Sequence, residues 1–223
     1  MNTAVAWVAL KTIVRREVRR ILRIWGQTLV PPAITMTLYF VIFGRMIGAR
    51  IGSMDGLAYI DFIVPGLIMM AVIQNSYGNI VSSFFGAKFQ HFIEEMLVAP
   101  TPNAVILAGY VIGAMLRGFL VGAIVLVVAM GFTDLRLLHP LITLLTLLLA
   151  SLVFAFAGFI NAMFARKFDD IAIVPTFVLT PLTYLGGVFY SVHLLPPFWK
   201  TLSQFNPILY MVNAFRYGLL GVS

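Results

Sequence analysis

Five long apolar runs alternate with short polar segments along the chain. The runs cover residues 28–43, 60–85, 103–132, 140–165 and 171–190. Most of them reach the roughly 20 apolar residues that a helix needs to cross the hydrocarbon core of a bilayer. The pattern therefore predicts an all-α integral membrane protein with five membrane spans.

The segment before the first run, residues 1–25, has a different pattern. Its apolar side chains recur at steps of three or four, and basic side chains fill the rest of the helical wheel. The apolar positions are Trp7, Leu10, Val14, Val18, Ile21 and Trp25, and the basic ones are Lys11, Arg15, Arg16, Arg19, Arg20 and Arg23. Such a segment is typical of an amphipathic helix that lies on the membrane surface with its cations among anionic headgroups. The alternative is that these charges only set the topology of the chain.

Four polar segments connect the predicted spans. Residues 44–59 and 133–139 are expected on the outer side, and residues 86–102 and 166–170 on the inner side. Nine basic residues fall in the inner segments, including the first helix, and four fall in the outer loops. Because cytoplasmic segments carry the excess of Lys and Arg, this count predicts a cytoplasmic N-terminus.

The apolar pattern changes after residue 190. Prolines at positions 196, 197 and 207 interrupt an aromatic, apolar stretch that runs to residue 223. Irregular backbone at membrane depth must be covered by protein or face water. We expect short helices and turns at the outer face, partly entering the membrane, and the run 208–220 is too short for a confident sixth span.

The composition agrees with a membrane protein and excludes an ordinary soluble domain. The chain is 61% hydrophobic and 10% charged, whereas soluble domains are about 25% charged. A net charge of +7 would suggest a nucleic-acid partner in a soluble protein. Here six of the fifteen basic residues lie between positions 11 and 23, so membrane orientation explains the charge and no nucleic acid is expected. Cysteine is absent, which excludes disulfides and thiolate metal sites.

Arg117 lies near the middle of the third predicted span. About 14 residues, or about 20 Å of helix, separate it from either interface. An intramembrane charge is expected to face the bundle interior or a wet cavity, with a partner. Acidic residues are expected only outside the membrane core, so the candidate partners are neutral: Gln74, Asn75 and Asn79 of the second span, or free carbonyls near a proline. These side chains could line a translocation path, or Arg117 could only cross-link helices.

The inner segment 86–102 carries two of the eight acidic residues, Glu94 and Glu95. One face of a short helix there would hold Phe89, Phe92, Ile93 and Met96. A short, stiff helix with an apolar face and a few charges is suited to docking a soluble partner. Ordinary packing beneath the spans is the alternative for the apolar face.

Motifs for chemistry are absent from the sequence. Glu94 and Glu95 are adjacent, so on a helix they point about 100° apart and do not form an acid–base pair. The three histidines fall in three different loops, which does not favour a shared metal site. There is no G-x-x-x-x-G-K-[ST] phosphate loop for ATP. We therefore expect no catalytic, cofactor-binding or metal site on this chain.

Several motifs, in order along the chain, carry a family resemblance. They are QTLVPPAITMTLYFVIFG in the first span, FIVPGLIMM in the second, FFGAKFQHFIEEMLVAPTP in the inner segment, FARKFDDI in the inner turn, and VPTFVLTPLTYLGGVFYS with LLPPFW and FNPILY. Through them the chain resembles the ABC-2 type permeases, the type V exporter-like membrane subunits, and among these the bacterial inner-membrane permeases of the YadH type. The resemblance covers essentially the whole chain.

The resemblance implies a multi-pass permease of the bacterial inner membrane that works as a homodimer with two copies of a separate ABC ATPase. The ATPase would bind ATP and Mg²⁺. Residues 87–99 would be the coupling helix, and the inner turn with Arg166, Asp169 and Asp170 a second contact. Residues 1–25 would be the connecting helix, and the first, second and fifth spans would line the dimer interface and the path. The outer-face motif would comprise Pro196, Pro197, Asn206, Pro207 and Arg216.

In one respect the chain departs from the family pattern. A sixth span should follow Arg216, and the sequence ends first, so we expect a truncated form of a six-span subunit. The leading interpretation is an ATP-driven exporter permease. The alternatives are a carrier that works without an ATPase and, further behind, a lipid-modifying membrane enzyme. A path lined by Gln74, Asn75 and Arg117 would suit an amphiphile or an anionic lipid-linked molecule.

Overall fold

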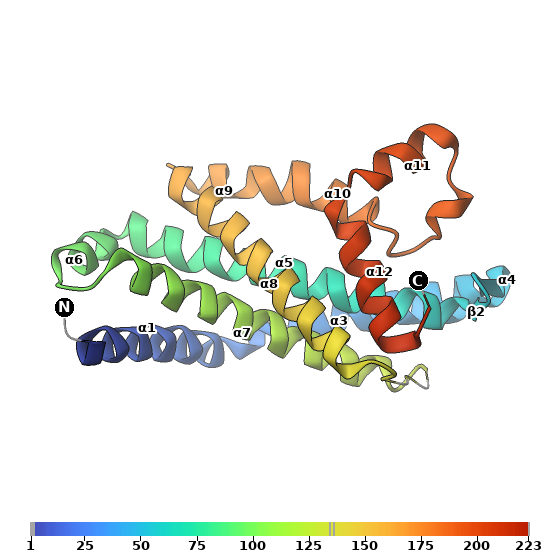
Figure 1. The fold of residues 1–223 in the computed structure, drawn as a ribbon, viewed down its shortest axis with the longest axis horizontal. Helices are drawn as coiled ribbons and strands as arrows, with labels where there is room; N and C mark the ends of the chain where they lie inside the picture. The colour runs from blue at the N-terminus through green and yellow to red at the C-terminus, as the bar shows by residue number, and fades with distance from the viewer. Residues whose placement is uncertain (1–2, 134, 136, 223) are drawn as a thin grey trace.

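The computed structural model describes residues 3–133, 135 and 137–222 of the chain, and it is an elongated helical bundle (Figure 1). Asp134 and Arg136, in the predicted outer turn, lie outside the described residues. In chain order the elements are α1 (Thr3–Arg23), α2 (Trp25–Thr28), α3 (Val30–Tyr39), η1 (Phe40–Ile47), α4 (Gly48–Ile51), β1 (Ser53–Met54), β2 (Leu57–Ala58), α5 (Tyr59–Phe89), α6 (Phe92–Val98), α7 (Asn103–Ala129), α8 (Pro140–Phe164), α9 (Phe168–Val174), η2 (Pro175–Leu179), α10 (Thr180–Tyr184), η3 (Val192–Leu194), α11 (Pro197–Gln204) and α12 (Pro207–Leu220).

The helical, membrane-embedded fold class is confirmed. Among the described residues, four helical stretches are long and apolar enough to cross a membrane, namely Trp25–Ile51, Tyr59–Phe89, Asn103–Ala129 and Pro140–Phe164. They coincide with the first four predicted spans, although two of them are longer than expected. The two ends of the bundle are called the α6 end, with α1, α6 and the start of α9, and the hairpin end, with β1 and β2 (Figure 1).

The first span is longer than its predicted end at residue 43. Residues 44–51, expected in a polar loop, instead continue the helix through the π-helical turns of η1 and through α4. The continuing apolar sequence FVIFGRMI explains the extension, and Gly52, with a φ of 76°, ends it. Asp55 and Gly56 then turn the chain with positive φ between β1 and β2, as a tight hairpin requires.

The second span is also longer than expected, and it occupies the centre of the bundle. α5 continues to Phe89, so residues 86–89 are helical rather than part of a loop. Within its most apolar window 78% of the residues are buried, against 17% for the first span. A helix that is apolar on all sides is a buried helix. α7 and α8 pack against α5, and α12 packs across α5 and α8 (Figure 1).

The fifth predicted span, residues 171–190, is shorter and less regular in the structure. The helix formed by α9, η2 and α10 begins at Phe168 and ends at Tyr184. Pro175 opens the π-helical turns of η2, because proline has no N–H to donate. Gly187, with a φ of 67°, lies in the turn that follows. This stretch is not one of the four span-length helices.

One side of α8 faces away from the protein. Its exposed large apolar side chains are Leu141, Leu144, Leu145, Leu148, Leu149, Val153, Phe156, Ile160, Met163 and Phe164. Soluble monomers rarely expose a continuous apolar surface of this kind. It fits a helix in contact with lipid.

Candidate functional site

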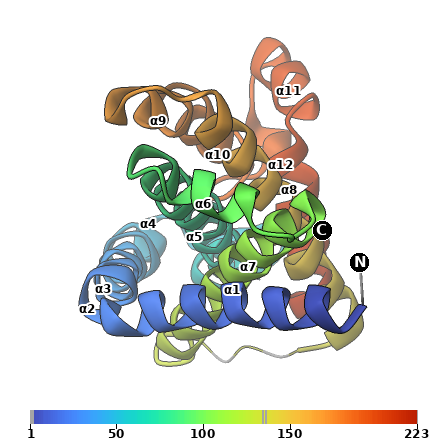
Figure 2. The same ribbon diagram turned by 90° about the vertical axis from the view of Figure 1, so that its left-hand side faces the viewer.

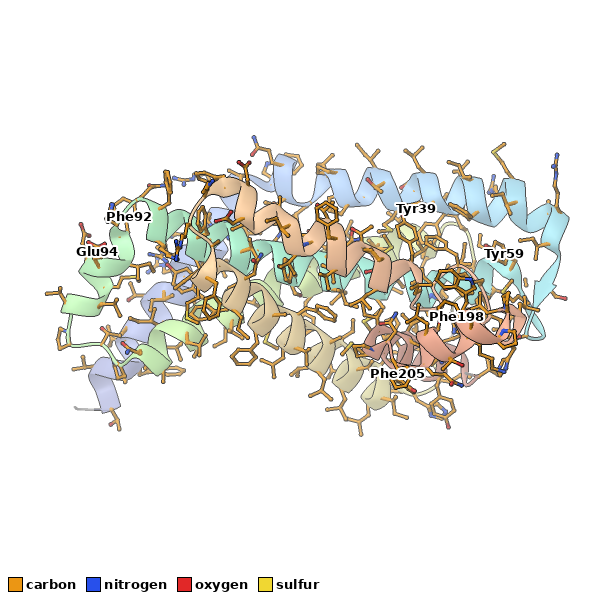
Figure 3. The ribbon with its side chains drawn as sticks, turned by 90° about the horizontal axis from the view of Figure 1, so that it is seen from above. Tyr39, Tyr59, Phe92, Glu94, Phe198 and Phe205 are labelled. Carbon is orange, nitrogen blue, oxygen red and sulfur yellow. The ribbon has the colours of Figure 1, made fainter. Side chains whose placement is uncertain are left out.

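α6 is the most protruding helix at its end of the bundle. It begins after His91, which has a φ of 61°, and none of its residues is buried. Glu94 and Glu95 lie in its first turn, where the helix dipole favours negative charge. Glu94 also pairs with His91 Nδ1 at 2.7 Å. Figure 3 shows Phe92 and Glu94 on the outside of this end of the molecule.

The predicted apolar face of α6 divides into two parts. Ile93 and Met96 pack inward against the side chains of α5 and α7, as the packing alternative anticipated. Phe92 and Phe89 remain exposed, as do Leu97 and Val98, the last at 88% of its possible area. The exposed part is a small apolar surface beside two carboxylates.

The α8–α9 turn lies beside the end of α5. Lys88 of α5 donates to the carbonyl oxygens of Met163 at 2.6 Å and Ala165 at 2.8 Å. These carbonyls belong to the last turn and the end of α8, where a cation satisfies free acceptors. Phe168 of α9 packs on Phe89 of α5, with ring centroids 4.8 Å apart. The two predicted docking segments therefore meet at one end of the protein.

Asp170 holds the shape of this turn. Its Oδ2 accepts hydrogen bonds from the backbone N–H groups of Arg166 at 2.8 Å and Lys167 at 3.0 Å. These two bonds lower the pKa of the Asp170 carboxyl, because they stabilise its charged form. The side chains of Arg166 and Asp169 are exposed. Of the three residues assigned to this turn, Asp170 has a structural role and the other two are open to a partner.

α1 lies across the same end of the bundle and packs on α7 (Figure 2). Two glycines one turn apart on α7 permit this close approach. A Cβ on Gly109 would come within 2.5 Å of Ile13 Cγ2, and one on Gly113 within 2.6 Å of Glu17 Cβ. Trp7 of α1 and Trp25 of α2 are exposed. One side of α1 is therefore fixed to protein, and contact of its exposed side with lipid stays a prediction.

Glu17 is the residue that sequence reasoning missed. Only 1% of its surface is exposed. Ser83 of α5 lies 2.7 Å from its carboxylate, and Arg20 and Arg16 of α1 lie 3.1 and 3.5 Å away. A buried carboxylate needs such partners, because desolvation otherwise penalises its charge. The spacing of Gly109 and Gly113, opposite Ile13 and Glu17, is the signal that could have found it.

Two arginines of α1 reach into the bundle. Arg20 donates to Asn79 Oδ1 at 2.7 Å, and Arg16 donates to Tyr110 Oη at 2.6 Å. Asn79 was a candidate partner of Arg117, but the structure gives it Arg20 instead. The reason is that α1 packs against the bundle, so Arg20 reaches α5, whereas a helix that lay only on the bilayer surface would not bring it there.

Arg117 has no hydrogen bond in the part of the chain that the structure describes, and its Nε is buried without a partner. Asn75 donates to Ala71 O of its own helix, and no hydrogen bond joins Gln74 to Arg117. Arg20 lies close enough to act on Arg117 electrostatically. Arg117 therefore adds to a concentration of positive charge between α1, α5 and α7. The neutral partners predicted for it are not seen.

An acidic side chain also occurs in a span, contrary to expectation. Asp61 lies in the first turn of α5, and the Thr133 hydroxyl donates to its carboxylate. The position is at the hairpin end, where water can reach a helix terminus. Among the described residues no group of three or more His, Asp or Glu side chains could hold a metal ion.

The outer-face residues join three segments at the hairpin end. Arg216 of α12 donates to Gly187 O at 2.9 Å and to Phe62 O at 3.3 Å, and its guanidinium lies 3.9 Å from the centre of the Phe62 ring. Asn206 caps α12 and donates to Leu182 O at 2.6 Å. Pro197 and Pro207 occupy first helical positions and Pro196 an N-cap. These residues hold the region together rather than lining an open site.

Comparison with known proteins gives consistent matches over most of the chain. The sequence pattern of the family described as ABC-2 type transporter matches residues 8–220. The inner membrane transport permease YadH of Escherichia coli K12 is 60% identical over 217 residues, covering 97% of this chain and 85% of that protein. Nodulation protein J of Rhizobium leguminosarum bv. viciae is 26% identical over 187 residues, covering 82% and 71%. Nodulation protein J of Rhizobium meliloti is equally similar, at 26% over 187 residues.

Proposed function

Because this chain belongs to the ABC-2 type transporter family, as a multi-pass transport permease of the bacterial inner membrane, we propose that it couples transport to a separate ABC ATPase. In this proposal the chain forms the path and converts closure of the ATPase into opening of that path. ATP and Mg²⁺ bind to the partner, and this chain binds no cofactor.

The observation that carries the proposal is the surface formed by α6 and the α8–α9 turn. Phe92, Leu97 and Val98 are exposed beside Glu94 and Glu95 at the end of the bundle. Lys88 and Phe168 join this surface to α5 and α8. Force on α6 would therefore reach the central span directly. This is the geometry that a coupling surface needs.

Orientation follows from the same surface. If α6 docks on a soluble ATPase, then the α6 end faces the cytoplasm, and α1 with its six cations lies there too. The excess of basic residues on this side supports the assignment. The hairpin end, with β1, β2 and the outer-face residues, then faces the periplasm.

A second copy of the chain would complete the path. The first span is only 17% buried in its most apolar window, and Ile34 and Leu38 of α3 are exposed. Ile173 and Phe177, on α9 and η2, are exposed as well. In Figure 2, α3 and α9 lie toward the same side of α5. This apolar side supports a homodimer bound to two ATPase copies, with the first, second and fifth spans at its centre.

The test is co-purification of a co-expressed ABC ATPase from the same organism, using a tag on the permease. Wild type is expected to retain the ATPase, and Glu94→Lys/Glu95→Lys and Val98→Asp to lose it. Leu194→Asp is the matched control, because it places the same charge on an exposed apolar residue at the hairpin end. If the ATPase never co-purifies with folded permease, a carrier that works without an ATPase becomes the better account.

A further inference from the structure

A basic cleft lies between α1, the end of α5 and α6, with a volume of about 980 Å³. Its walls contain five of the six cations of α1. These cations are Arg15, Arg16, Arg19, Arg20 and Arg23, and Ser83 of α5 lies in the opposite wall. The volume is in the range of sites for small organic ligands and exceeds that of a single inorganic anion.

The cleft has an excess of positive charge. Among the described residues that line the cleft, Glu17 is the one carboxylate, and that group is occupied by Ser83, Arg16 and Arg20. Arg15, Arg19 and Arg23 have no hydrogen-bond or ion-pair partner among the described residues. Three guanidinium groups are therefore available to a ligand.

The walls of the cleft are fixed before any ligand binds. Glu17 joins α1 to α5 through Ser83, and Arg20 joins it again through Asn79. On the other side α1 is packed on α7 at Gly109 and Gly113. A preorganised site loses less entropy on binding than a mobile helix would. This distinguishes the cleft from a flexible basic segment that only follows the membrane surface.

The position of the cleft suits a ligand that enters from the membrane. Arg23 precedes Trp25, where the first apolar helix begins. Trp25 and Leu22 are exposed beside it, and tryptophan is typical of the headgroup region. The arginines thus lie at headgroup depth, and an apolar tail bound there can remain in the bilayer.

We propose that this cleft binds the phosphate-bearing headgroup of a membrane amphiphile, and that it is where such cargo enters the permease. The claim that cargo enters here rests on the proposed transport function, whereas the claim that the cleft binds a phosphate headgroup does not. Guanidinium groups match phosphate oxygens with paired hydrogen bonds. Free inorganic phosphate shares this chemistry but lacks the tail.

The test measures binding to purified permease in nanodiscs of neutral phosphatidylcholine, with dodecyl phosphate and inorganic phosphate as separate probes. Dodecyl phosphate is expected to bind saturably, at one site per chain, and at least about tenfold more tightly than inorganic phosphate. Both Arg19→Gln and the double variant Arg15→Gln/Arg19→Gln should weaken binding of dodecyl phosphate, the double variant by about tenfold or more. Arg19→Lys should weaken binding of dodecyl phosphate less than Arg19→Gln does, because the positive charge remains and only the paired N–H donors of the guanidinium are lost.

Lys11→Gln is the matched control, because Lys11 lies on the exposed side of α1 outside the cleft. It removes the same charge as Arg19→Gln from the same helix. Equal weakening by Lys11→Gln and Arg19→Gln would overturn the proposal in favour of general surface electrostatics. Equal affinity for dodecyl phosphate and inorganic phosphate would overturn the claim that the ligand is an amphiphile. Thermal unfolding of each variant checks that it remains folded.

Entry of cargo is tested separately with the ATPase complex. Dodecyl phosphate is expected to stimulate ATP hydrolysis by the wild-type complex and not by the Arg15→Gln/Arg19→Gln complex. Binding without stimulation would overturn the cargo role while leaving the binding site. Loss of the ATPase from the wild-type complex would instead contradict the proposed function. The binding measurement in nanodiscs uses the permease alone, so it does not depend on the ATPase.

Discussion

Ser83 Oγ on α5 lies 2.7 Å from both carboxylate oxygens of Glu17 on α1. This contact joins a helix that the sequence places on the membrane surface to the most buried span of the protein. With Arg20 bound to Asn79, it makes α1 a part of the bundle. Movement of α1 and movement of α5 are therefore linked.

Removal of the Glu17 carboxylate should destabilise the protein. In Glu17→Ala, Ser83 loses its acceptor and Arg16 and Arg20 lose their counter-charge. Because both arginines are partly exposed, we expect a cost of about 1–3 kcal/mol rather than the larger value for a fully buried pair. Thermal unfolding of purified permease measures it. Glu95→Ala, at an exposed position of α6, is the control, and equal melting temperatures for the two variants would contradict this account.

The contact between α1 and α7 depends on small residues at two positions. Gly113→Ala places a methyl group 2.6 Å from Glu17 Cβ, so the helices must separate. Overpacking of this kind costs about 1–3 kcal/mol. Gly78→Ala is the control, because a Cβ there meets no atom within 4 Å and alanine favours helix. A lower melting temperature is expected for Gly113→Ala alone; an equal loss in Gly78→Ala would show that the α1 contact is not the cause.

The α8–α9 turn should respond to acid through Asp170. Backbone hydrogen bonds from Arg166 and Lys167 lower the pKa of its carboxyl in the folded protein. A depressed carboxyl pKa contributes stability above the unfolded value of about 3.9, and this contribution is lost as pH falls through the folded pKa. Protection of the Arg166 and Lys167 amides from hydrogen exchange, corrected for intrinsic rates, should therefore decrease below about pH 3.9.

Asp170→Asn provides the comparison for this turn. The amide side chain does not titrate, so the variant should show weaker protection at neutral pH and no loss on acidification. An acid-dependent loss of the same size in the variant would assign the effect to another group.

Membrane orientation can be measured directly because the chain has no native cysteine. Ser53→Cys lies in β1 at the hairpin end and Gln90→Cys lies next to α6, and both positions are exposed. In spheroplasts a membrane-impermeant maleimide should label Ser53→Cys at once and Gln90→Cys only after permeabilisation. The reverse pattern would place α6 outside the cytoplasm and exclude ATPase docking there.

Sequence patterns located the helices well where length and hydropathy determine them. The predicted runs 103–132 and 140–165 differ from α7 and α8 by a few residues at most. The helical extension 44–51 and the early end at Tyr184 were not predicted, because π-helical turns and the prolines and glycines of this region shift helix ends locally. The hairpin from Ser53 to Ala58 was likewise read only as loop.

The polar contacts could not be predicted in the same way. Whether Glu17 is buried depends on Ser83, which is 66 residues away in sequence. The pairing of Asn79 with Arg20 depends on the same docking of α1. A helical wheel of residues 1–25 shows that apolar and basic side chains alternate around the helix, but it does not show which side packs against the rest of the protein. Only the matching spacing of Ile13 and Glu17 with Gly109 and Gly113 carried that information.

The most direct test of the account is a site-specific cross-link between α6 and the ATPase. A photoreactive group on Val98→Cys, at a position of α6 that is 88% exposed, should yield a permease–ATPase product in membranes that contain both proteins. The same group on Arg50→Cys, at the hairpin end, should yield none. Cross-linking from Val98→Cys alone is the predicted result. No ATPase product from Val98→Cys, or equal products from both positions, would contradict the claim that α6 couples this permease to an ATPase.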